Sequence, residues 1–147
     1  MSNMQNNLAT IQTYLNFDGV CDQALDFYSK TIGAEVVSKM RFKDSPDPNT
    51  CSGGQADKVM HAAFKVGNTL VMASDGRCTG TPKFDGFHLT INAANDAEAA
   101  KLFAALSDGG QVMMPLGKTF FASSFGMLKD RFGVHWMVLV VNCPTAA

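Results

Sequence analysis

Two histidines of this sequence stand where a β-strand would present them to a ligand. His61 alternates with Ala63 along the stretch 59–66, and His88 alternates with Thr90. Alternation puts such residues on one face of a strand, since side chains repeat with a period of two. An imidazole can bind a ligand, coordinate a metal or transfer a proton near neutral pH. The competing interpretation of each is a histidine that is hydrogen-bonded to a polar neighbour on the sheet.

Other polar and aromatic side chains are also candidates. Tyr14 and Asn16 share one side of the alternating stretch 11–17, where both could orient a ligand by hydrogen bonding. Asp75 directly follows a predicted strand, which is typical of a turn residue and compatible with a site residue. Phe121 belongs to an aromatic group that forms either an apolar wall of a site or part of the core.

Composition and charge exclude several classes of function. The 147 residues carry 12 Lys and Arg against 13 Asp and Glu, so the net charge of −1 argues against nucleic acid as a partner. The longest apolar run, 136–141, is far shorter than the roughly 20 residues of a membrane span. The polar N-terminus is not a secretory signal, and the four cysteines form no C-x-x-C pair. We therefore expect a cytoplasmic protein with reduced thiols and no membrane contact.

The pattern of alternating and helical stretches predicts an α+β protein. A helix is expected over 20–32, ending at Gly33, and a second helix after Asn95, where Glu98 completes the spacing of a capping box. Strands are expected at 11–17, 34–42, 59–66, 69–74, 87–92, 111–115, 122–129 and 135–141. The long polar stretch 44–57 is predicted to be a loop, and its length is compatible with either a functional or a mobile role.

These elements give the order βαβββ twice, which indicates an internal duplication. Shifting the sequence by 76 residues aligns 12–36 with 88–112 with five identities, where chance gives about two. We therefore expect one domain over 1–147 built from two modules, about 11–75 and 87–141. The mixed sheets of the two modules would turn their uncovered faces toward each other and enclose a cavity suited to a small molecule.

Several spaced motifs resemble those of one protein family. They are YLNFDG at 14–19, A-L-x-F-Y at 24–28, IGAE at 32–35, His61-Ala62, and the stretch 118–138, in which Phe121 stands where Trp is usual. The chain resembles the PhnB-like branch of the vicinal oxygen chelate superfamily, which includes glyoxalase I, bleomycin resistance proteins and ring-cleaving dioxygenases. The resemblance implies paired βαβββ modules and, frequently, a homodimer.

The resemblance also implies where a divalent metal would be held. Metal-using relatives take one ligand from each of the first, fourth, fifth and eighth strands. The first and fifth positions correspond to Gln12 and His88, the eighth to Met137, and the fourth to Val71 or Met72. Relatives have glutamates at the fourth and eighth positions, so both carboxylates are missing here, and glyoxalase I activity is not expected. The methyltransferase label of some relatives is not expected to apply either, because no glycine-rich strand-to-helix turn is present.

Our first hypothesis is a protein that binds a small molecule in the paired-module cavity without the usual metal site. The candidate ligand-binding residues are Tyr14, Asn16, His61, His88, Thr90, Phe121 and Met137. The alternative is a metal-dependent lyase, isomerase or dioxygenase-like enzyme with a shifted site at His61, His88 and Asp75, to which Gln12 adds a further candidate ligand. A third hypothesis is a structural role through dimerisation. The sequence identifies no catalytic residue and no cofactor other than this divalent metal.

Overall fold

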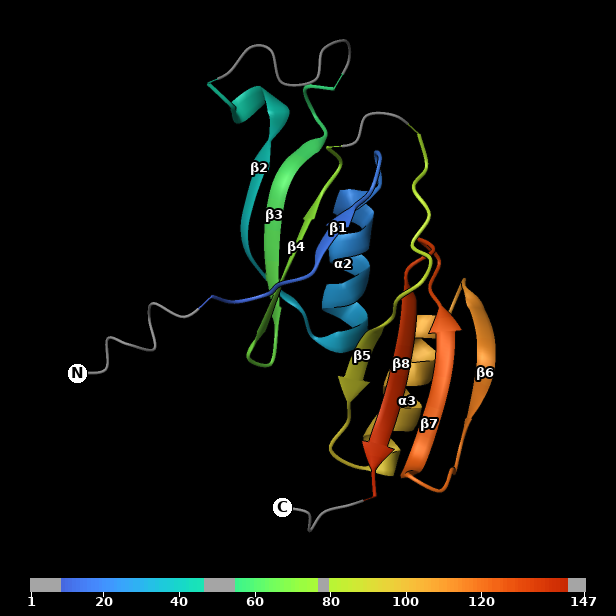
Figure 1. The fold of residues 1–147 in the computed structure, drawn as a ribbon. Helices are drawn as coiled ribbons and strands as arrows, with labels where there is room; N and C mark the ends of the chain where they lie inside the picture. Colours follow the sequence, from blue (N-terminus) through green and yellow to red (C-terminus); the bar gives the residue numbers. More distant parts are fainter. Residues whose placement is uncertain (1–8, 47–54, 77–79, 143–147) are drawn as a thin grey trace, which may run out of the picture. The chain divides into compact units, whose positions relative to one another are not determined.

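The computed structural model describes residues 9–46, 55–76 and 80–142, and contains two four-stranded sheets (Figure 1). The first βαβββ module consists of β1 (Tyr14–Asn16), α2 (Cys21–Ile32), β2 (Glu35–Arg41), the short 3-10 helix η1 (Phe42–Asp44), β3 (Val59–Val66) and β4 (Thr69–Ser74). The second consists of β5 (Leu89–Asn92), α3 (Asp96–Ser107), β6 (Gln111–Gly117), β7 (Ala122–Lys129) and β8 (His135–Val141).

The two sheets have the same topology. Their strand orders are β1-β4-β3-β2 and β5-β8-β7-β6. In each sheet the first strand of the module pairs in parallel with the last, and the other pairs are antiparallel. The predicted α+β class and the duplicated βαβββ order are therefore confirmed.

Most predicted boundaries agree with the structure, and the largest difference lies at the first strand. Only Tyr14–Asn16 pairs with β4, and the side chain of Ile11 is 99% exposed. Placing Ile11 in a strand was therefore wrong, because alternation shows which side chains share a face, whereas a strand also needs a backbone partner. A smaller difference is η1, which begins at the buried Phe42, where the last residue of a strand was expected.

The compact units of the chain do not coincide with the modules in sequence order. One unit comprises 1–21 and 35–80, and the other comprises 22–34 and 81–147. Apart from its first residue, helix α2 therefore belongs to the unit that contains the second sheet. The ring of Tyr28 lies 5.5 Å from that of Trp136 on β8, in edge-to-face geometry.

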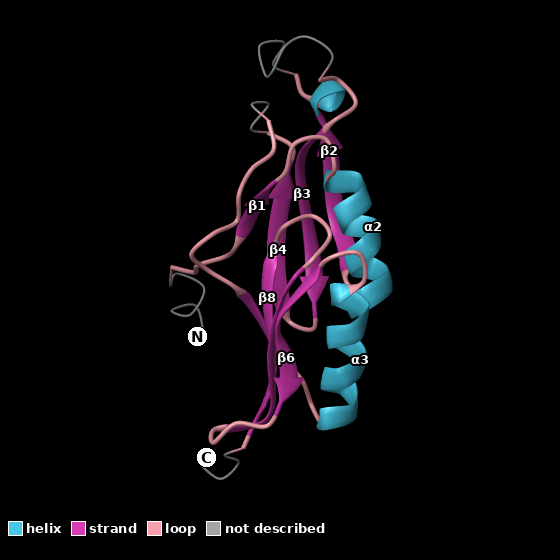
Figure 2. Cartoon of the chain, turned by 90° about the vertical axis from the view of Figure 1, so that its right-hand side faces the viewer, coloured by secondary structure: helices cyan, strands magenta, loops and turns pink. Residues whose placement is uncertain are grey.

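Helix α3 covers one face of the second sheet (Figure 2). Its apolar face buries Ala99, Phe103 and Leu106. The side chain of Asn95 accepts a hydrogen bond of 2.8 Å from the amide of Glu98, as the capping box predicts. The Glu98 carboxylate reaches one residue further back than predicted and accepts from the amide of Ala94 at 2.7 Å.

Gly126 on β7 lets the helix approach the sheet closely. A β-carbon there would lie 2.8 Å from the Phe103 ring and 2.9 Å from the α-carbon of Leu116. Both are shorter than side-chain contacts in folded proteins allow, so only glycine fits without a shift of α3 or β6. In the part of the chain that the structure describes, no helix is long and apolar enough to cross a membrane.

Candidate functional site

The second sheet leaves one face uncovered by α3, and methionines occupy its centre. Along β7 the side chains alternate between buried and half-buried, and the half-buried positions define the uncovered face. On this face Met127 pairs directly with Met137 of β8 and with Met114 of β6. Thr90 of β5 pairs with Met137 on the other side. We call Met114, Met127 and Met137 the methionine row.

Aromatic side chains border the methionine row on one side. Phe125 and Leu139 form the neighbouring cross-strand pair. The ring of Phe121 lies 5.3 Å from that of Phe125, and the ring of Phe120 lies 5.2 Å from that of Phe121. Phe121 is 40% exposed and Phe120 95% exposed. These rings therefore form a wall that remains accessible, rather than a core cluster.

Polar side chains border the row on the opposite side. His135 pairs with Lys129, and the rings of His88 and His135 stand edge to face at 5.4 Å. The Nε2 atom of His135 lies 3.8 Å from a carboxylate oxygen of Asp85. The uncovered face thus passes from aromatic through thioether to imidazole and ammonium groups.

The first sheet carries a tyrosine-histidine pair between β1 and β3. The Tyr14 hydroxyl and the Nδ1 atom of His61 are 3.0 Å apart, and the two rings lie 5.7 Å apart. Tyr14 is 42% exposed. Asn16 pairs with Ser74 at the end of the same parallel strand pair. The structure therefore brings together two of the predicted candidates, Tyr14 and His61.

Strand register determines which residue of β4 corresponds to Met137 of β8. Tyr14 pairs with Met72 in the first sheet as Thr90 pairs with Met137 in the second. Thr90 is also 76 residues after Tyr14, which matches the sequence repeat. Of the two residues left open, Met72 is therefore the equivalent, and Val71 lies on the opposite, buried side.

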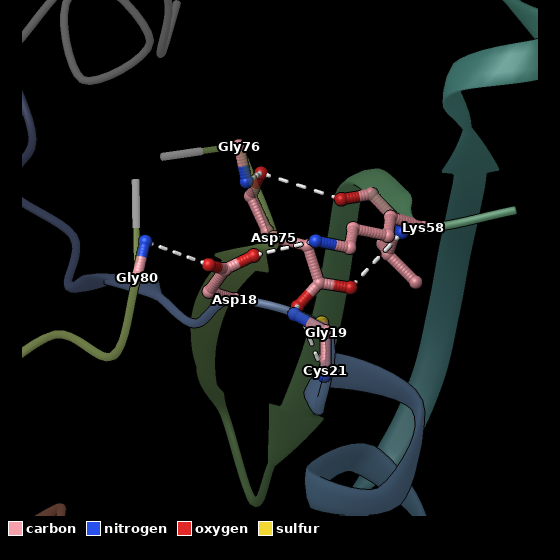
Figure 3. Close-up of polar contacts among 9 residues, drawn as sticks. Asp18, Gly19, Cys21, Lys58, Asp75, Gly76 and Gly80 are labelled. Atoms are coloured by element: carbon pink, nitrogen blue, oxygen red, sulfur yellow. Dashed lines mark hydrogen bonds and ion pairs between the residues drawn. The ribbon is translucent and has the colours of Figure 1, made fainter. Parts of the chain in front are cut away.

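Asp75 is a buried acceptor of backbone hydrogen bonds (Figure 3). It is 2% exposed. One of its oxygens accepts from the amides of Gly19 at 2.7 Å and Cys21 at 3.1 Å, and the other accepts from the amide of Val59 at 3.1 Å. These bonds tie the entry to α2 and the start of β3 to the end of β4, as expected of a structural turn residue. A metal-binding role for Asp75 remains a prediction.

Asp18 makes a second set of polar contacts in the same region. Lys58 donates to one oxygen of Asp18 at 2.7 Å, and the other oxygen accepts from the amide of Gly80 at 2.8 Å (Figure 3). The side chain of Lys58 is 28% exposed and that of Asp18 is 15% exposed. Gly19, which follows Asp18, adopts a φ of 89°, a backbone conformation that favours glycine. The YLNFDG motif thus builds the turn into α2.

The predicted metal ligands are divided between the two compact units of the chain. Among the residues that the structure describes, no three or more His, Cys, Asp or Glu side chains are arranged to hold a metal ion. Gln12, His61 and Asp75 belong to the first unit and His88 to the second. Gln12 is exposed.

Sequence reasoning missed Asp130 and His135. Asp130 is 2% exposed and accepts from the Tyr28 hydroxyl, the Trp136 indole and two backbone amides. The position of Asp130 shortly before a glycine turn could have indicated a buried hydrogen-bond acceptor. His135 alternates with Met137, so the same parity argument that selected His88 would have selected it.

Comparison with known proteins gives the family. Residues 9–139 match the family described as 3-demethylubiquinone-9 3-methyltransferase. The chain belongs to this family. It is the PhnB-like branch that the sequence motifs indicated.

Several relatives of this PhnB-like chain match it over nearly their full lengths. Protein YjdN of Escherichia coli is 31% identical over 90% of this chain and 95% of its own. The solved structure of PA1353 from Pseudomonas aeruginosa is 41% identical, covers 91% of this chain and 98% of its own, and has a TM-score of 0.81. The PhnB protein of Bacillus cereus is 29% identical, covers 90% and 100%, and has a TM-score of 0.73. A glyoxalase/bleomycin resistance/dioxygenase domain from Frankia, 14% identical with a TM-score of 0.69, shares the fold and covers 92% of this chain and 100% of its own.

Proposed function

We propose that this PhnB-like chain binds a small organic molecule on the uncovered face of its second sheet, without the hard-metal site of glyoxalases. The observation that carries the proposal is the methionine row between an exposed aromatic wall and a polar edge. Methionine side chains are flexible and polarizable, so they adapt to irregular apolar ligands and contact aromatic rings favourably. Convergent polar groups at one end of an apolar surface would fix the orientation of such a ligand.

The residues of the face indicate the chemistry of the ligand. Phe121 and Phe125 favour a flat, apolar body. His88, His135 and Lys129 at the opposite border offer hydrogen-bond donors and positive charge to a polar or anionic end. We therefore propose an aromatic or similarly flat molecule that carries an acidic or hydrogen-bonding group.

The absence of carboxylates at two key positions supports a function without a hard divalent metal. Met72 and Met137 occupy equivalent registers on the last strands of the two modules. The family resemblance implies glutamates at the corresponding positions of metal-using members. Thioether sulfur is a soft donor and does not replace a carboxylate for Mg²⁺ or Mn²⁺.

The test uses 8-anilinonaphthalene-1-sulfonate, a flat aromatic anion, as the probe. The chain is labelled with ¹³C in its methionine methyl groups and titrated, with the dispersed spectrum as the check that it stays folded. Saturable shifts of the Met127 and Met137 methyls, weakened in Phe125→Ala, would support the proposal. Absence of saturable shifts, or shifts confined to methionines of the first sheet such as Met60, would overturn it.

The metal-dependent lyase, isomerase or dioxygenase-like enzyme at His61, His88 and Asp75 remains the alternative. Native metal content separates the two. Near-stoichiometric metal in the untagged chain that disappears in His88→Ala would favour the enzyme. No bound metal, and no thermal shift with added nickel, manganese, zinc or iron, would retire it.

We also propose that the chain forms a homodimer. Two strands at sheet edges, β2 and β6, expose large apolar side chains, including Val37 and Met113, each 48% exposed. Exposed apolar edge strands favour association with another chain. Light scattering after size exclusion should give twice the chain mass, and a monomer across the micromolar range would contradict this.

A further inference from the structure

The methionine row and the histidine beside it have the chemistry of a soft-metal site. We propose that the thioethers of Met127 and Met137 and the imidazole of His135 bind one soft monovalent cation of the Cu(I) class. This inference does not depend on the proposed organic ligand, because the metal alone is the probe in its test.

Strand register brings the three donors to one patch. Met127 and Met137 are direct antiparallel partners, so their β-carbons lie about 5 Å apart. His135 precedes Met137 by two residues and therefore lies on the same face, about 7 Å along β8. Three rotatable bonds in each methionine let both sulfurs turn toward an ion that the imidazole also reaches.

The type of donor determines the type of metal. Thioether and imidazole donors suit Cu(I), whereas Mg²⁺, Ca²⁺ and Mn²⁺ prefer carboxylate and carbonyl oxygens. The carboxylate of Asp85 lies 3.8 Å from Nε2 of His135, and its negative charge beside the donors favours a bound cation. The His135 side chain is 18% exposed, so a bound ion would be partly shielded from water.

The fold itself does not require methionine in this row. The equivalent row of the first sheet consists of Tyr14, Met72, Ala63 and Ser38. Only one of its four positions is methionine, although strand order and pairing are the same. The packing of the fold alone therefore does not explain why three methionines lie side by side in the second sheet.

Lys129 is the charged group that opposes the proposed site. It pairs with His135 and completes the patch beside Met127. Its ammonium group repels a bound cation, while the Asp85 carboxylate attracts one. Replacing Lys129 with Met should therefore strengthen binding, an effect that a purely packing role of the row does not produce.

The test measures binding of Ag(I), a redox-stable substitute for Cu(I), to the full chain. Thiols bind soft metals more tightly than thioethers, so the background variant carries Cys51→Ser, Cys78→Ser and Cys143→Ser and keeps the buried Cys21. We expect one Ag(I) per chain and selective shifts of the Met127 and Met137 methyl signals in slow or saturable exchange. Competition with a Cu(I) chelator under reducing anaerobic conditions extends the measurement to copper.

Matched variants separate this site from general metal affinity. Met127→Leu and Met137→Leu preserve volume and should each weaken binding about tenfold or more, as should His135→Asn. Met113→Leu changes the neighbouring methionine of β6 outside the row and should leave binding unchanged. The proposal is overturned if the background variant binds no Ag(I), if the shifts fall on other methionines, or if Met113→Leu weakens binding as much as the row variants do.

Discussion

Tyr28 on helix α2 donates a hydrogen bond of 2.6 Å to Asp130, which lies 102 residues later, just after β7. The same carboxylate oxygen accepts from the Trp136 indole at 2.9 Å. The other oxygen accepts from the amides of Phe132 at 2.8 Å and Val134 at 3.1 Å. One buried carboxylate thus joins the helix of the first module to the end of the second module's sheet.

We expect Tyr28→Phe to lower the free energy of unfolding by about 1.5–3 kcal/mol, the cost of losing a hydrogen bond to a buried charged group. Asp130→Ala should cost more, because it leaves the tyrosine, the indole and two amides without their acceptor. Urea unfolding of the two variants measures both effects. Equal stability of Asp130→Ala and wild type would show that the carboxylate does not hold α2 in place.

Asp75 offers a second stability test that also bears on the metal alternative. Asp75→Ala removes the acceptor of three backbone amides and should destabilise the chain by several kcal/mol, at about 1–3 kcal/mol per unsatisfied buried group. Asp57→Ala is the matched control, because that side chain is 88% exposed and should change stability by less than about 0.5 kcal/mol. If Asp75→Ala lost bound metal and kept full stability, the metal-binding interpretation of Asp75 would replace the structural one.

The sequence predicted the elements well where one face of a strand is buried. The boundaries of β7 and β8 were predicted correctly because their side chains alternate between the covered and uncovered faces. The hairpin between β3 and β4 was equally clear, because Gly67 marks its turn with a φ of 59°.

The partners of these elements could not be predicted in the same way. The periodicity of α2 correctly indicated that Tyr28 is buried, but a helical stripe does not say against which sheet it packs. The methionine row likewise depends on the register between β6, β7 and β8, which contains a bulge between Val112 and Met114. Single-strand patterns do not carry such relations between strands, so Met114 and Met127 were not among the predicted site residues.

Gly126 tests how closely α3 must approach its sheet. Gly126→Ala should destabilise the chain by about 1–3 kcal/mol, because the new methyl group would overlap the Phe103 ring and the Leu116 backbone. Gly117→Ala is the control, since no atom lies within 4 Å of its β-carbon position. Thermal unfolding of both variants gives the comparison, and the close-packing account fails if the two alanines have the same effect.

Asp96 should contribute to stability in a pH-dependent way. Hydrogen bonds from Ser124 at 2.6 Å and Ser123 at 2.7 Å stabilise its carboxylate and lower its pKa below the usual value near 3.8. Because the unfolded chain has the higher pKa, this contribution is fully present above that value and is lost as the pH falls through the lowered pKa of the folded chain.

We therefore expect Asp96→Asn to lose stability relative to wild type at pH 6, with the difference shrinking as the pH falls below the usual aspartate value. Urea midpoints measured from pH 6 down to pH 2.5 test this, with Asp26→Asn as the control. Asp26 also lies on a helix but is largely exposed and bonded only to Lys30 among the contacts described. A difference between Asp96→Asn and wild type that stays constant with pH would show that the serine bonds act on the neutral and charged forms alike.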